Sequence, residues 1–337
     1  MRALVLAKHG PPDDVLEVRE WPDPKVGPDD VLIEVRAAGL NFADVLARVG
    51  LYPDAPKPPC VMGYEVAGTV RELGSNVNGF EVGQRVLGAT RFDGFAELVS
   101  TPAGNVLPLS DTLSFEQGAA IPVNYATAYA AVELMASVRE SERVLVHAAA
   151  GGVGIAALQV LRPRGAEVIG TASASKHDAI REQGVTHPID YRSQDVKTEV
   201  DRITGGAGVD VVLDAIGDFK TSYSMLAPGG RLILYGVSKL MTGDRRNLPK
   251  TIKEVATMPR FNAIRLMNDN KAVMGLNLLH WWDRRGSLEE LTRPLVAMVD
   301  RGDIAPVVAA SFPIEHAAEA HRFIQDRKNT GKVVLAL

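Results

Sequence analysis

Apolar and polar residues alternate in short runs along the first third of the chain. Such period-two runs are typical of strands that bury one face. Turn-forming pairs such as Gly27-Pro28 and Asn78-Gly79 separate the runs. The predicted strands lie at 2–7, 14–20, 31–37, 64–73, 83–87 and 94–100. This pattern predicts a β-rich, partly barrel-like domain.

From about Tyr125 the pattern changes to longer apolar, β-branched runs at regular intervals. These runs lie at 143–148, 167–172, 187–191, 209–214, 231–236 and 272–278. Helical periodicity fills several of the gaps, at 152–162, 175–183 and 196–203. Strands that alternate with helices indicate βαβ units and a parallel sheet covered on both faces. We therefore predict an α/β fold whose doubly wound, Rossmann-type sheet has six strands.

The last part of the chain has a third pattern of apolar and polar residues, and this segment is too short to form a domain of its own. Its predicted elements are a helix at 287–301, a strand at 305–312, a helix at 315–327 and a strand at 332–337. We expect them to complete the first domain. The predicted domains are thus 1–123 with 283–337, and 124–282. The apolar run 272–282 is expected to be an edge strand buried against a second copy of the chain.

A glycine-rich turn joins the first strand of the parallel sheet to the helix that follows it. The spacing Ala149-x-Gly151-x-x-Gly154 is the dinucleotide fingerprint with alanine in place of its first glycine. Gly151 allows backbone N–H groups to approach a pyrophosphate, and Gly154 allows the helix to pack closely on the strand. The predicted cofactor-binding residues of this turn are Ala150, Gly151, Gly152, Val153 and Gly154. The alternative is a tight turn that binds no ligand.

The residues after the second strand of this sheet indicate which nicotinamide cofactor binds. An acidic residue there would hold a ribose 2′-hydroxyl and repel a 2′-phosphate. This chain instead has Ser173 at that place and Lys176 nearby, while Tyr191 and Arg192 follow the third strand. We predict binding of NADPH rather than NADH. The alternative is that Lys176 and Arg192 are ordinary solvated charges.

Composition and charge exclude several classes. The 337 residues are 46% hydrophobic and 23% charged, as in an ordinary globular protein, and the net charge of −4 does not favour nucleic acid as a partner. The single cysteine, Cys60, permits no intrachain disulfide. It is expected to be a buried small hydrophobe, and the seven histidines show no pairing at ligand spacing, so no metal site is predicted. The longest apolar stretch, 144–161, is interrupted by glycines, so no membrane span is expected.

Several segments together resemble a known family over essentially the whole chain. They are AGLNFADVLARVGLYP at 38–53, GYEVAGTV at 63–70, the AAGGVG turn at 149–154 and GKVVL at 331–335. The chain resembles the zinc-independent quinone oxidoreductases of the medium-chain dehydrogenase/reductase superfamily. GTASASKHDAI at 170–180 and VTHPIDY at 185–191 resemble the vesicle amine transport protein branch more closely. Tyr64 stands where zinc-dependent members have a histidine ligand.

The resemblance implies a GroES-like catalytic domain beside the Rossmann domain, with a substrate cleft between them. It places Tyr52 as a proton donor, Asn41 near the nicotinamide or the substrate carbonyl, and Tyr64 on the cleft wall. Cofactor contacts are implied for Asn41, Thr127, Gly236, Val237 and Lys332. Structural alternatives remain open: Asn41 as a helix cap, Tyr52 as a packed loop aromatic, Tyr64 as filler and Thr127 as an ordinary helix residue.

Three functions follow as hypotheses. The first is an NADPH-dependent reductase acting on a quinone or another activated C=C, such as an enone. The second is a 2-enoyl-thioester reductase using NADPH or NADH, since Tyr52 serves either substrate. The third, from a different class, is a non-catalytic NADPH-binding protein. A homodimer is implied by the resemblance, and a cytoplasmic location is expected because nothing in the cysteine usage indicates an oxidising compartment.

Overall fold

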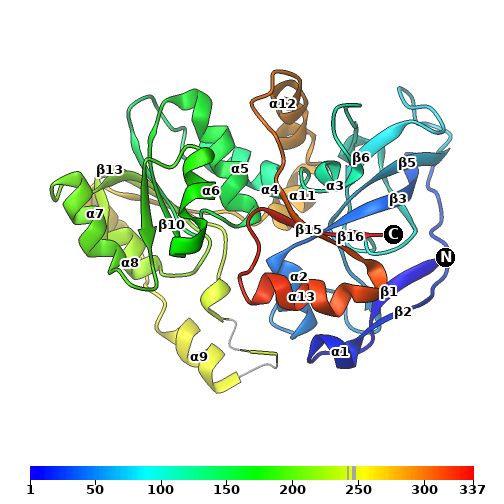
Figure 1. The fold of residues 1–337 in the computed structure, drawn as a ribbon, viewed down its shortest axis with the longest axis horizontal. Coiled ribbons are helices and arrows are strands. Elements are labelled where there is room, and N and C mark those ends of the chain that lie inside the picture. Colours follow the sequence, from blue (N-terminus) through cyan, green and yellow to red (C-terminus); the bar gives the residue numbers. More distant parts are fainter. Residues whose placement is uncertain (241–242, 245–247) are drawn as a thin grey trace. The chain divides into compact units, whose positions relative to one another are not determined.

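The computed structural model describes residues 1–240, 243–244 and 248–337, and its ribbon is drawn in Figure 1. The chain forms two units, which are described separately below. The first unit contains Met1–Ala126, Gly243–Arg246 and Leu278–Leu337, and the second contains Thr127–Thr242 and Asn247–Asn277. Among the described residues, every helix is too short or too polar to cross a bilayer.

The first unit is built on a seven-stranded sheet in the order β15-β16-β3-β5-β6-β8, with β7 also paired to β3. Its strands are β3 (Asp30–Leu40), β5 (Glu65–Leu73), β6 (Arg85–Ala89), β7 (Leu98–Pro102), β8 (Val106–Pro108), β15 (Val308–Pro313) and β16 (Lys332–Ala336). The C-terminal strand β16 runs antiparallel to β3, with Val333 opposite Leu40. The end of the chain therefore completes this sheet, as the sequence predicted.

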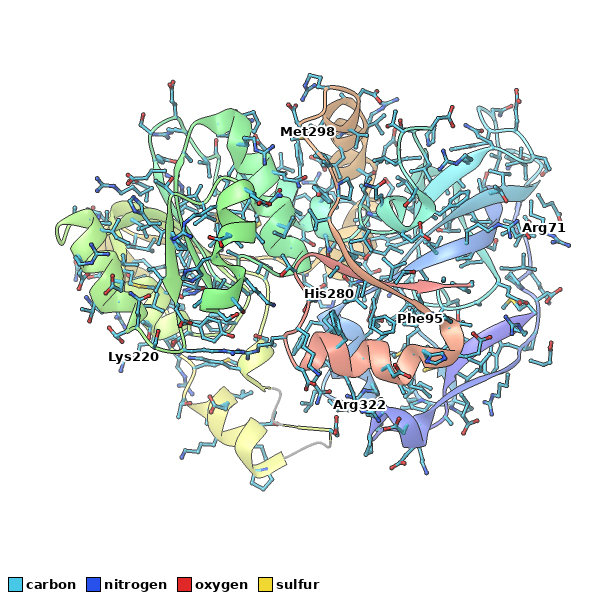
Figure 2. All side chains as sticks on the ribbon, viewed as in Figure 1. Arg71, Phe95, Lys220, His280, Met298 and Arg322 are labelled. Carbon is cyan, nitrogen blue, oxygen red and sulfur yellow. The ribbon has the colours of Figure 1, made fainter. Side chains whose placement is uncertain are left out.

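A smaller sheet and several helices surround the large one. The small sheet has the order β2-β1-β4, with β1 (Arg2–Leu6), β2 (Leu16–Glu20) and β4 (Cys60–Val61). The helices are α1 (Pro12–Val15), α2 (Phe42–Arg48), α3 (Phe115–Gly118), α11 (Leu278–Arg285), α12 (Glu289–Asp300) and α13 (Ala317–Gln325). The helix α4 (Asn124–Tyr129) begins in the first unit and ends in the second. An ion pair between Arg322, labelled in Figure 2, and Asp13 joins α13 to α1.

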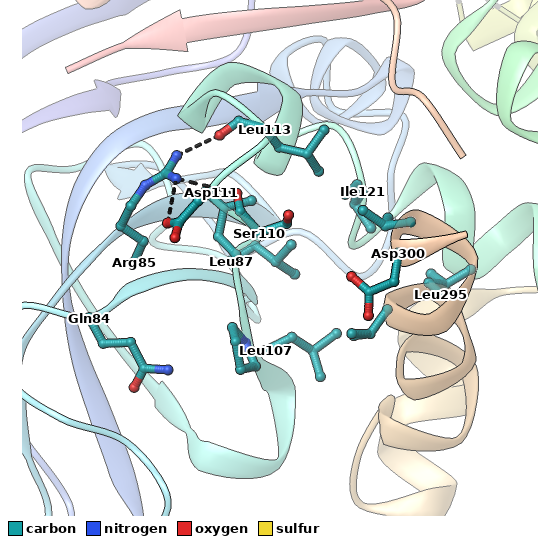
Figure 3. Close-up of a pocket in the computed structure, with 14 residues that line it drawn as sticks. Gln84, Arg85, Leu87, Leu107, Ser110, Asp111, Leu113, Ile121, Leu295 and Asp300 are labelled. Atoms are coloured by element: carbon teal, nitrogen blue, oxygen red, sulfur yellow. Dashed lines mark hydrogen bonds and ion pairs between the residues drawn. The ribbon is translucent and has the colours of Figure 1, made fainter. Parts of the chain in front are cut away.

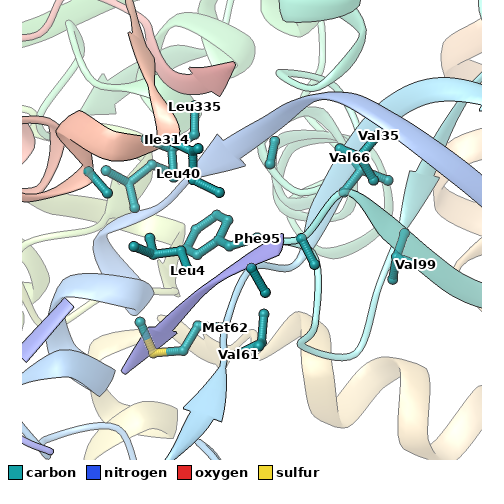
Figure 4. Close-up of a cluster of buried hydrophobic side chains, with 14 of the residues drawn as sticks. Leu4, Val35, Leu40, Val61, Met62, Val66, Phe95, Val99, Ile314 and Leu335 are labelled. Atoms are coloured by element: carbon teal, nitrogen blue, oxygen red, sulfur yellow. The ribbon is translucent and has the colours of Figure 1, made fainter. Parts of the chain in front are cut away.

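The core of the first unit lies between its sheets and α13. Phe95 is fully buried and lies among Leu4, Leu40 and Met62 (Figure 4). The cluster draws on residues from near both ends of the chain, including Val333 and Leu335 of β16. Burying side chains of this size stabilises by about 1.5–3 kcal/mol each, so Val333 and Leu335 favour the position of β16 in the sheet.

The second unit holds a six-stranded, fully parallel sheet in the order β11-β10-β9-β12-β13-β14. Its strands are β9 (Arg143–Val146), β10 (Glu167–Ala172), β11 (His187–Asp190), β12 (Val209–Asp214), β13 (Leu226–Leu234) and β14 (Ala272–Gly275). The order reverses at β9, which is the switch point of a doubly wound sheet. The predicted fold class is confirmed.

The helices of the second unit follow from this strand order. They are α5 (Gly152–Leu161), α6 (His177–Glu182), α7 (Val196–Thr204), α8 (Phe219–Ser224), α9 (Leu248–Ala256) and α10 (Ala263–Asp269), with a π-helical segment, η2 (Ala130–Met135), before the sheet. Right-handed crossovers place α5 and α6 on one face of the sheet and α8 and α10 on the other, because the chain moves outward from β9 in opposite directions.

The structure corrects some predicted boundaries. The run 272–282 is not one edge strand: β14 ends at Gly275, and both tryptophans, Trp281 and Trp282, lie in α11. β14 is still the edge of the sheet. Residues 14–15 belong to α1, since Pro12 favours the first position of a helix, and β2 begins only at Leu16. Likewise, the run 94–100 becomes a strand only from Leu98.

Candidate functional site

The dinucleotide turn links β9 to α5 at the carboxyl edge of the parallel sheet. A Cβ atom on Gly154 would lie 2.6 Å from the carbonyl oxygen of Ala149, so no other residue fits without moving the backbone. Ala148 adopts a left-handed conformation with φ of 51°. The turn is fixed to β10 because the Ala149 N–H donates to the Thr171 carbonyl over 3.0 Å. The close helix–strand packing predicted for Gly154 is therefore present.

The N-terminus of α5 is open on the side of this turn. Gly151, Gly152 and Val153 are partly exposed, whereas the helix is buried from Gly154 onward. The first N–H groups of a helix have no partner within it, and they coincide with the positive end of its dipole. The backbone of this partly exposed segment therefore offers hydrogen-bond donors to an anion.

A polar and basic group follows the ends of β10 and β11. Ser173 is buried directly after β10, and its hydroxyl lies 3.4 Å from that of Ser175. Lys176 is half-buried; burial lowers the pKa of its ammonium, the neighbouring Tyr191 raises it and Arg192 lowers it. Because β10 and β11 pair with Ala172 opposite Asp190, Lys176 and Tyr191 follow neighbouring strand ends. Their predicted role beside a cofactor 2′-phosphate stays a prediction.

The ends of β12 and β13 form a second wall at the same edge of the sheet. The Asp214 carboxylate accepts hydrogen bonds from the N–H groups of Ile216 (2.8 Å) and Gly217 (2.9 Å). A Cβ on Gly236 would lie 2.8 Å from the carbonyl carbon of Ala215, and a Cβ on Gly217 would lie 3.4 Å from the Cα of Val237. Gly236 and Val237 therefore pack directly against this turn. The segment that contains the predicted cofactor residues Gly236 and Val237 is thus held by contacts with the 215–217 turn.

Sequence reasoning missed a buried polar chain beneath the dinucleotide turn. It consists of Thr171, His147, Ser222 and Asp214, each at most 4% exposed, and we call it the His147 network. Thr171 Oγ1 lies 3.3 Å from His147 Nδ1, Ser222 Oγ lies 3.2 Å from His147 Nε2, and Ser222 donates to Asp214 over 2.7 Å. The signal available in the sequence was a histidine inside an otherwise apolar strand–turn segment.

In the first unit, the structure brings Asn41 and Lys332 together in a buried group. Lys332 forms an ion pair with Glu65 and donates to Asn41 Oδ1 over 2.6 Å, and Asn41 Nδ2 donates to Glu65 Oε1 over 2.9 Å. The second oxygen of Glu65 accepts from the N–H of Val123 over 2.7 Å. With Asp44, these residues form what we call the Asn41 cluster. Both ends of the Asn41 amide are held inside this cluster.

Asn41 also precedes α2, and Asp44 occupies the third position of that helix. The Asp44 carboxylate accepts from the Asn41 N–H over 2.8 Å, which is half of a capping box. Burial raises the pKa of Asp44 to about 7, while the Asn41 N–H and Lys332 work in the opposite direction. The capping alternative for this segment is therefore present in the structure, alongside the side-chain contacts of Asn41.

The two predicted tyrosines of the first unit also meet. The rings of Tyr52 and Tyr64 pack edge to face with centroids 6.3 Å apart, and Phe92 lies 5.1 Å from Tyr64. Burial, with help from Asp54 and Asp44, raises the pKa of Tyr52 to about 12, and burial also raises that of Tyr64. Both phenols are protonated at neutral pH, so each is chemically able to donate a proton.

Two further residues singled out in the sequence are buried. Thr127 lies in α4 and is buried. Cys60 is buried in β4, and burial raises the pKa of its thiol to about 11, as expected for a small structural side chain. Across the described part of the chain, no group of three or more His, Cys, Asp or Glu side chains is arranged to hold a metal ion.

A pocket of 440 Å³ lies elsewhere in the first unit (Figure 3). It is lined mainly by apolar residues, among them Leu87, Leu107 and Leu295, between β6, β8 and α12. Arg85, on its rim, is engaged with the carbonyl oxygens of Ser110 and Leu113. None of the residues predicted for catalysis or cofactor binding lines this pocket.

Two family models match the chain. The alcohol dehydrogenase GroES-like domain matches residues 27–111, and the zinc-binding dehydrogenase model matches residues 183–335. The first match falls in the first unit, in line with the GroES-like fold expected there.

Similar proteins cover the full length. The synaptic vesicle membrane protein VAT-1 homolog of rat is 39% identical over 339 residues, covering 99% of this chain and 84% of its own. The structure of Escherichia coli quinone oxidoreductase complexed with NADPH is 29% identical, with a TM-score of 0.86 and 100% of both chains covered. The structure of CurK enoyl reductase is also 29% identical, with a TM-score of 0.85, covering 99% of this chain and 98% of its own.

Proposed function

Because this chain belongs to the quinone oxidoreductase and vesicle amine transport protein branch of the medium-chain dehydrogenase/reductase superfamily, we propose that it is an NADPH-dependent reductase. Its substrate would be a quinone or another activated C=C. The observation that carries the proposal is the open N-terminus of α5, reached through a turn that only Gly154 permits. Bound NADPH would supply the hydride.

The residues of the second unit fit this cofactor. The backbone of Gly151–Gly154 would hold the pyrophosphate, as helix N-termini hold anions. Ser173, Lys176 and Tyr191 would surround the 2′-phosphate, and the segment 171–176 carries no carboxylate to repel it. A phosphate would also favour the charged form of Lys176, whose pKa is lowered by burial in the protein alone. NADH lacks this phosphate and is the less favoured cofactor.

The residues of the first unit fit the proton requirement. Reduction of a quinone or an enoyl thioester by hydride leaves an anion, which takes up one proton. Tyr52 would donate it, since its phenol is protonated at neutral pH. Asn41 Oδ1, which accepts from Lys332, would use its second lone pair to accept from the nicotinamide carboxamide, and Tyr64 would form an apolar wall.

Two specific observations favour different substrates. Similarity to the quinone oxidoreductase of Escherichia coli favours a quinone, and similarity to CurK enoyl reductase favours an enoyl thioester. The relatives named for synaptic vesicle membranes keep open the third hypothesis, NADPH binding without turnover. Tyr52 and Asn41 together favour an enzyme.

The test is NADPH oxidation by the purified protein with phenanthrenequinone or with crotonyl-CoA. Turnover of the first alone supports a quinone reductase, and turnover of the second alone supports an enoyl-thioester reductase. Cofactor binding without turnover of either supports the non-catalytic reading. Absence of NADPH binding would refute the proposal altogether.

A matched pair of variants tests the proton donor. Tyr52→Phe is expected to lower turnover about 10²-fold or more, because a positioned general acid contributes on that scale. Tyr64→Phe removes a buried hydroxyl with no hydrogen-bond partner among the described residues and should leave turnover nearly unchanged. Equal effects of the two substitutions would remove Tyr52 from the mechanism.

The assembly is also part of the proposal. We expect a homodimer, because β14 is the last strand at one edge of the parallel sheet among the described residues, and an edge strand can pair with a second copy. Light scattering of the purified protein distinguishes a dimer from a monomer. The cytoplasmic location stays a prediction from the sequence.

A further inference from the structure

The contacts of the His147 network permit only one assignment of hydrogen-bond donors and acceptors. Asp214 is fully buried and accepts from the Ser222 hydroxyl, so Ser222 Oγ is left as the acceptor toward His147 Nε2. Nε2 therefore carries the proton. Nδ1 is then the acceptor of a hydrogen bond that the Thr171 hydroxyl donates, and Thr171 Oγ1 itself accepts from the Ala148 N–H over 3.1 Å.

Only a neutral His147 imidazole lets every donor and acceptor in the network form a hydrogen bond. A second proton on Nδ1 would leave the Thr171 hydroxyl with two donors facing it and no acceptor for its own hydrogen. Burial lowers the pKa of His147, which agrees with the neutral form; Asp214 and Asp218 act in the opposite direction, and Lys239 acts with burial. A buried polar network of this kind is rigid when complete and costly when one member is lost.

The network touches both walls of the candidate cofactor site. At one end, Thr171 holds the N–H of Ala148, the left-handed residue that starts the dinucleotide turn. At the other end, Asp214 holds the N–H groups of Ile216 and Gly217. That second turn in turn supports the segment after β13, because the Lys239 N–H donates to the Ile216 carbonyl over 2.9 Å.

We propose that His147 is a positioning residue that ties the pyrophosphate-binding turn to the Asp214–Gly217 turn, so that both halves of the dinucleotide are held in one fixed geometry. This inference rests on the proposed NADPH binding of the second unit. It assigns His147 no contact with the cofactor and no proton transfer, since its two ring nitrogens are used within the network.

Two variants cut the network at different places. Ser222→Ala removes the link between His147 and Asp214, and Asp214 keeps its two backbone donors. His147→Leu removes both links. The matched control is His187→Gln. His187 begins β11, so it lies at the amino ends of the parallel strands, away from the network, and its partly exposed side chain pairs with Glu167.

Measuring the affinity of two ligands distinguishes effects at the Thr171 end of the network from effects at the Asp214 end. The ligands are NADPH and 2′-phospho-ADP-ribose, which lacks the nicotinamide, and both are titrated by calorimetry. His147→Leu is expected to weaken both ligands about tenfold or more. Ser222→Ala leaves the Thr171–Ala148 end intact and is expected to weaken NADPH about tenfold but 2′-phospho-ADP-ribose less than threefold. His187→Gln should change neither.

A role in stability alone gives a different result. In that case the melting temperature falls while the folded variants bind both ligands as the parent does, and the inference is overturned. A uniform loss for both ligands in Ser222→Ala also overturns it, because the link to Asp214 would then have no separate effect. Failure of the parent protein to bind NADPH refutes the proposed function instead, so the two failures are distinguishable.

Discussion

The Asn41 cluster and the His147 network are both buried and hydrogen-bonded, but they differ in charge. The first holds an ammonium against a carboxylate, Lys332 with Glu65, inside a protein interior. The second contains one carboxylate, Asp214, solvated by three donors, and otherwise neutral groups. Loss of one partner of a buried ion pair leaves an uncompensated charge, whereas loss of a neutral link leaves only an unpaired dipole.

This contrast separates what each region contributes. The Asn41 cluster joins β16, β5 and the start of α2, so its integrity is first a matter of stability. The His147 network joins two turns at the carboxyl edge of the sheet through side-chain hydrogen bonds. We therefore expect its loss to change the geometry of these turns more than the stability of the fold. The following experiments compare the two regions, beginning with the largest expected effect.

Lys332→Met breaks the Asn41 cluster. We expect the free energy of unfolding to fall by about 3–5 kcal/mol, since Glu65 would remain buried and charged without its partner. Denaturant unfolding measures this loss. Adding Glu65→Gln should recover much of it, and Lys328→Met, at an exposed pair with Asp326, is the matched control and should change little. A loss that the double variant does not recover would show that packing rather than charge governs this position.

Gly154→Ala alters the dinucleotide turn. The new methyl group would meet the Ala149 carbonyl at 2.6 Å, which displaces α5 from the turn. We expect NADPH affinity to fall at least tenfold, or about 1.4 kcal/mol, by fluorescence titration. Gly275→Ala, where a Cβ meets nothing within 4 Å, is the control in the same unit. Unchanged affinity in Gly154→Ala would contradict the placement of the pyrophosphate.

Lys176→Ala tests cofactor choice. NADPH affinity is expected to fall about tenfold, or about 1.4 kcal/mol, while NADH affinity changes little, because only the first carries the 2′-phosphate. Lys197→Ala, at an exposed position paired with Asp201, should leave both affinities unchanged. Parallel losses for the two cofactors would place Lys176 away from the phosphate.

Asp44→Asn tests how the stability of the Asn41 cluster depends on pH. The pKa of Asp44 is about 7 in the folded protein, above its ordinary value of 3.8, so the folded state retains a proton that the unfolded state has released. Stability of the parent should therefore fall as pH rises from about 4 to 7. The variant should lose about 1 kcal/mol or more of this dependence, and melting temperatures at several pH values measure it. An unchanged pH profile would show that Asp44 does not titrate in this range.

Much of the fold was predictable because its signals are local. The regular apolar runs from Arg143 onward predicted β9–β13, since a parallel strand buried on both faces is a continuous apolar segment. The run 272–282 misled because an apolar helix and an apolar strand look alike over short lengths. There the strand ends at Gly275, and α11 packs the remaining apolar residues in another unit.

The sequence by itself determined the order of elements, the dinucleotide turn and the absence of an acidic residue at Ser173, because each is encoded within a few neighbouring residues. Only the tertiary structure decided that Lys332 meets Asn41 across 291 residues, and that His147 meets Ser222 across 75. Such contacts depend on which strands become neighbours in a sheet, and that choice is made by burial of the whole core rather than by any local pattern.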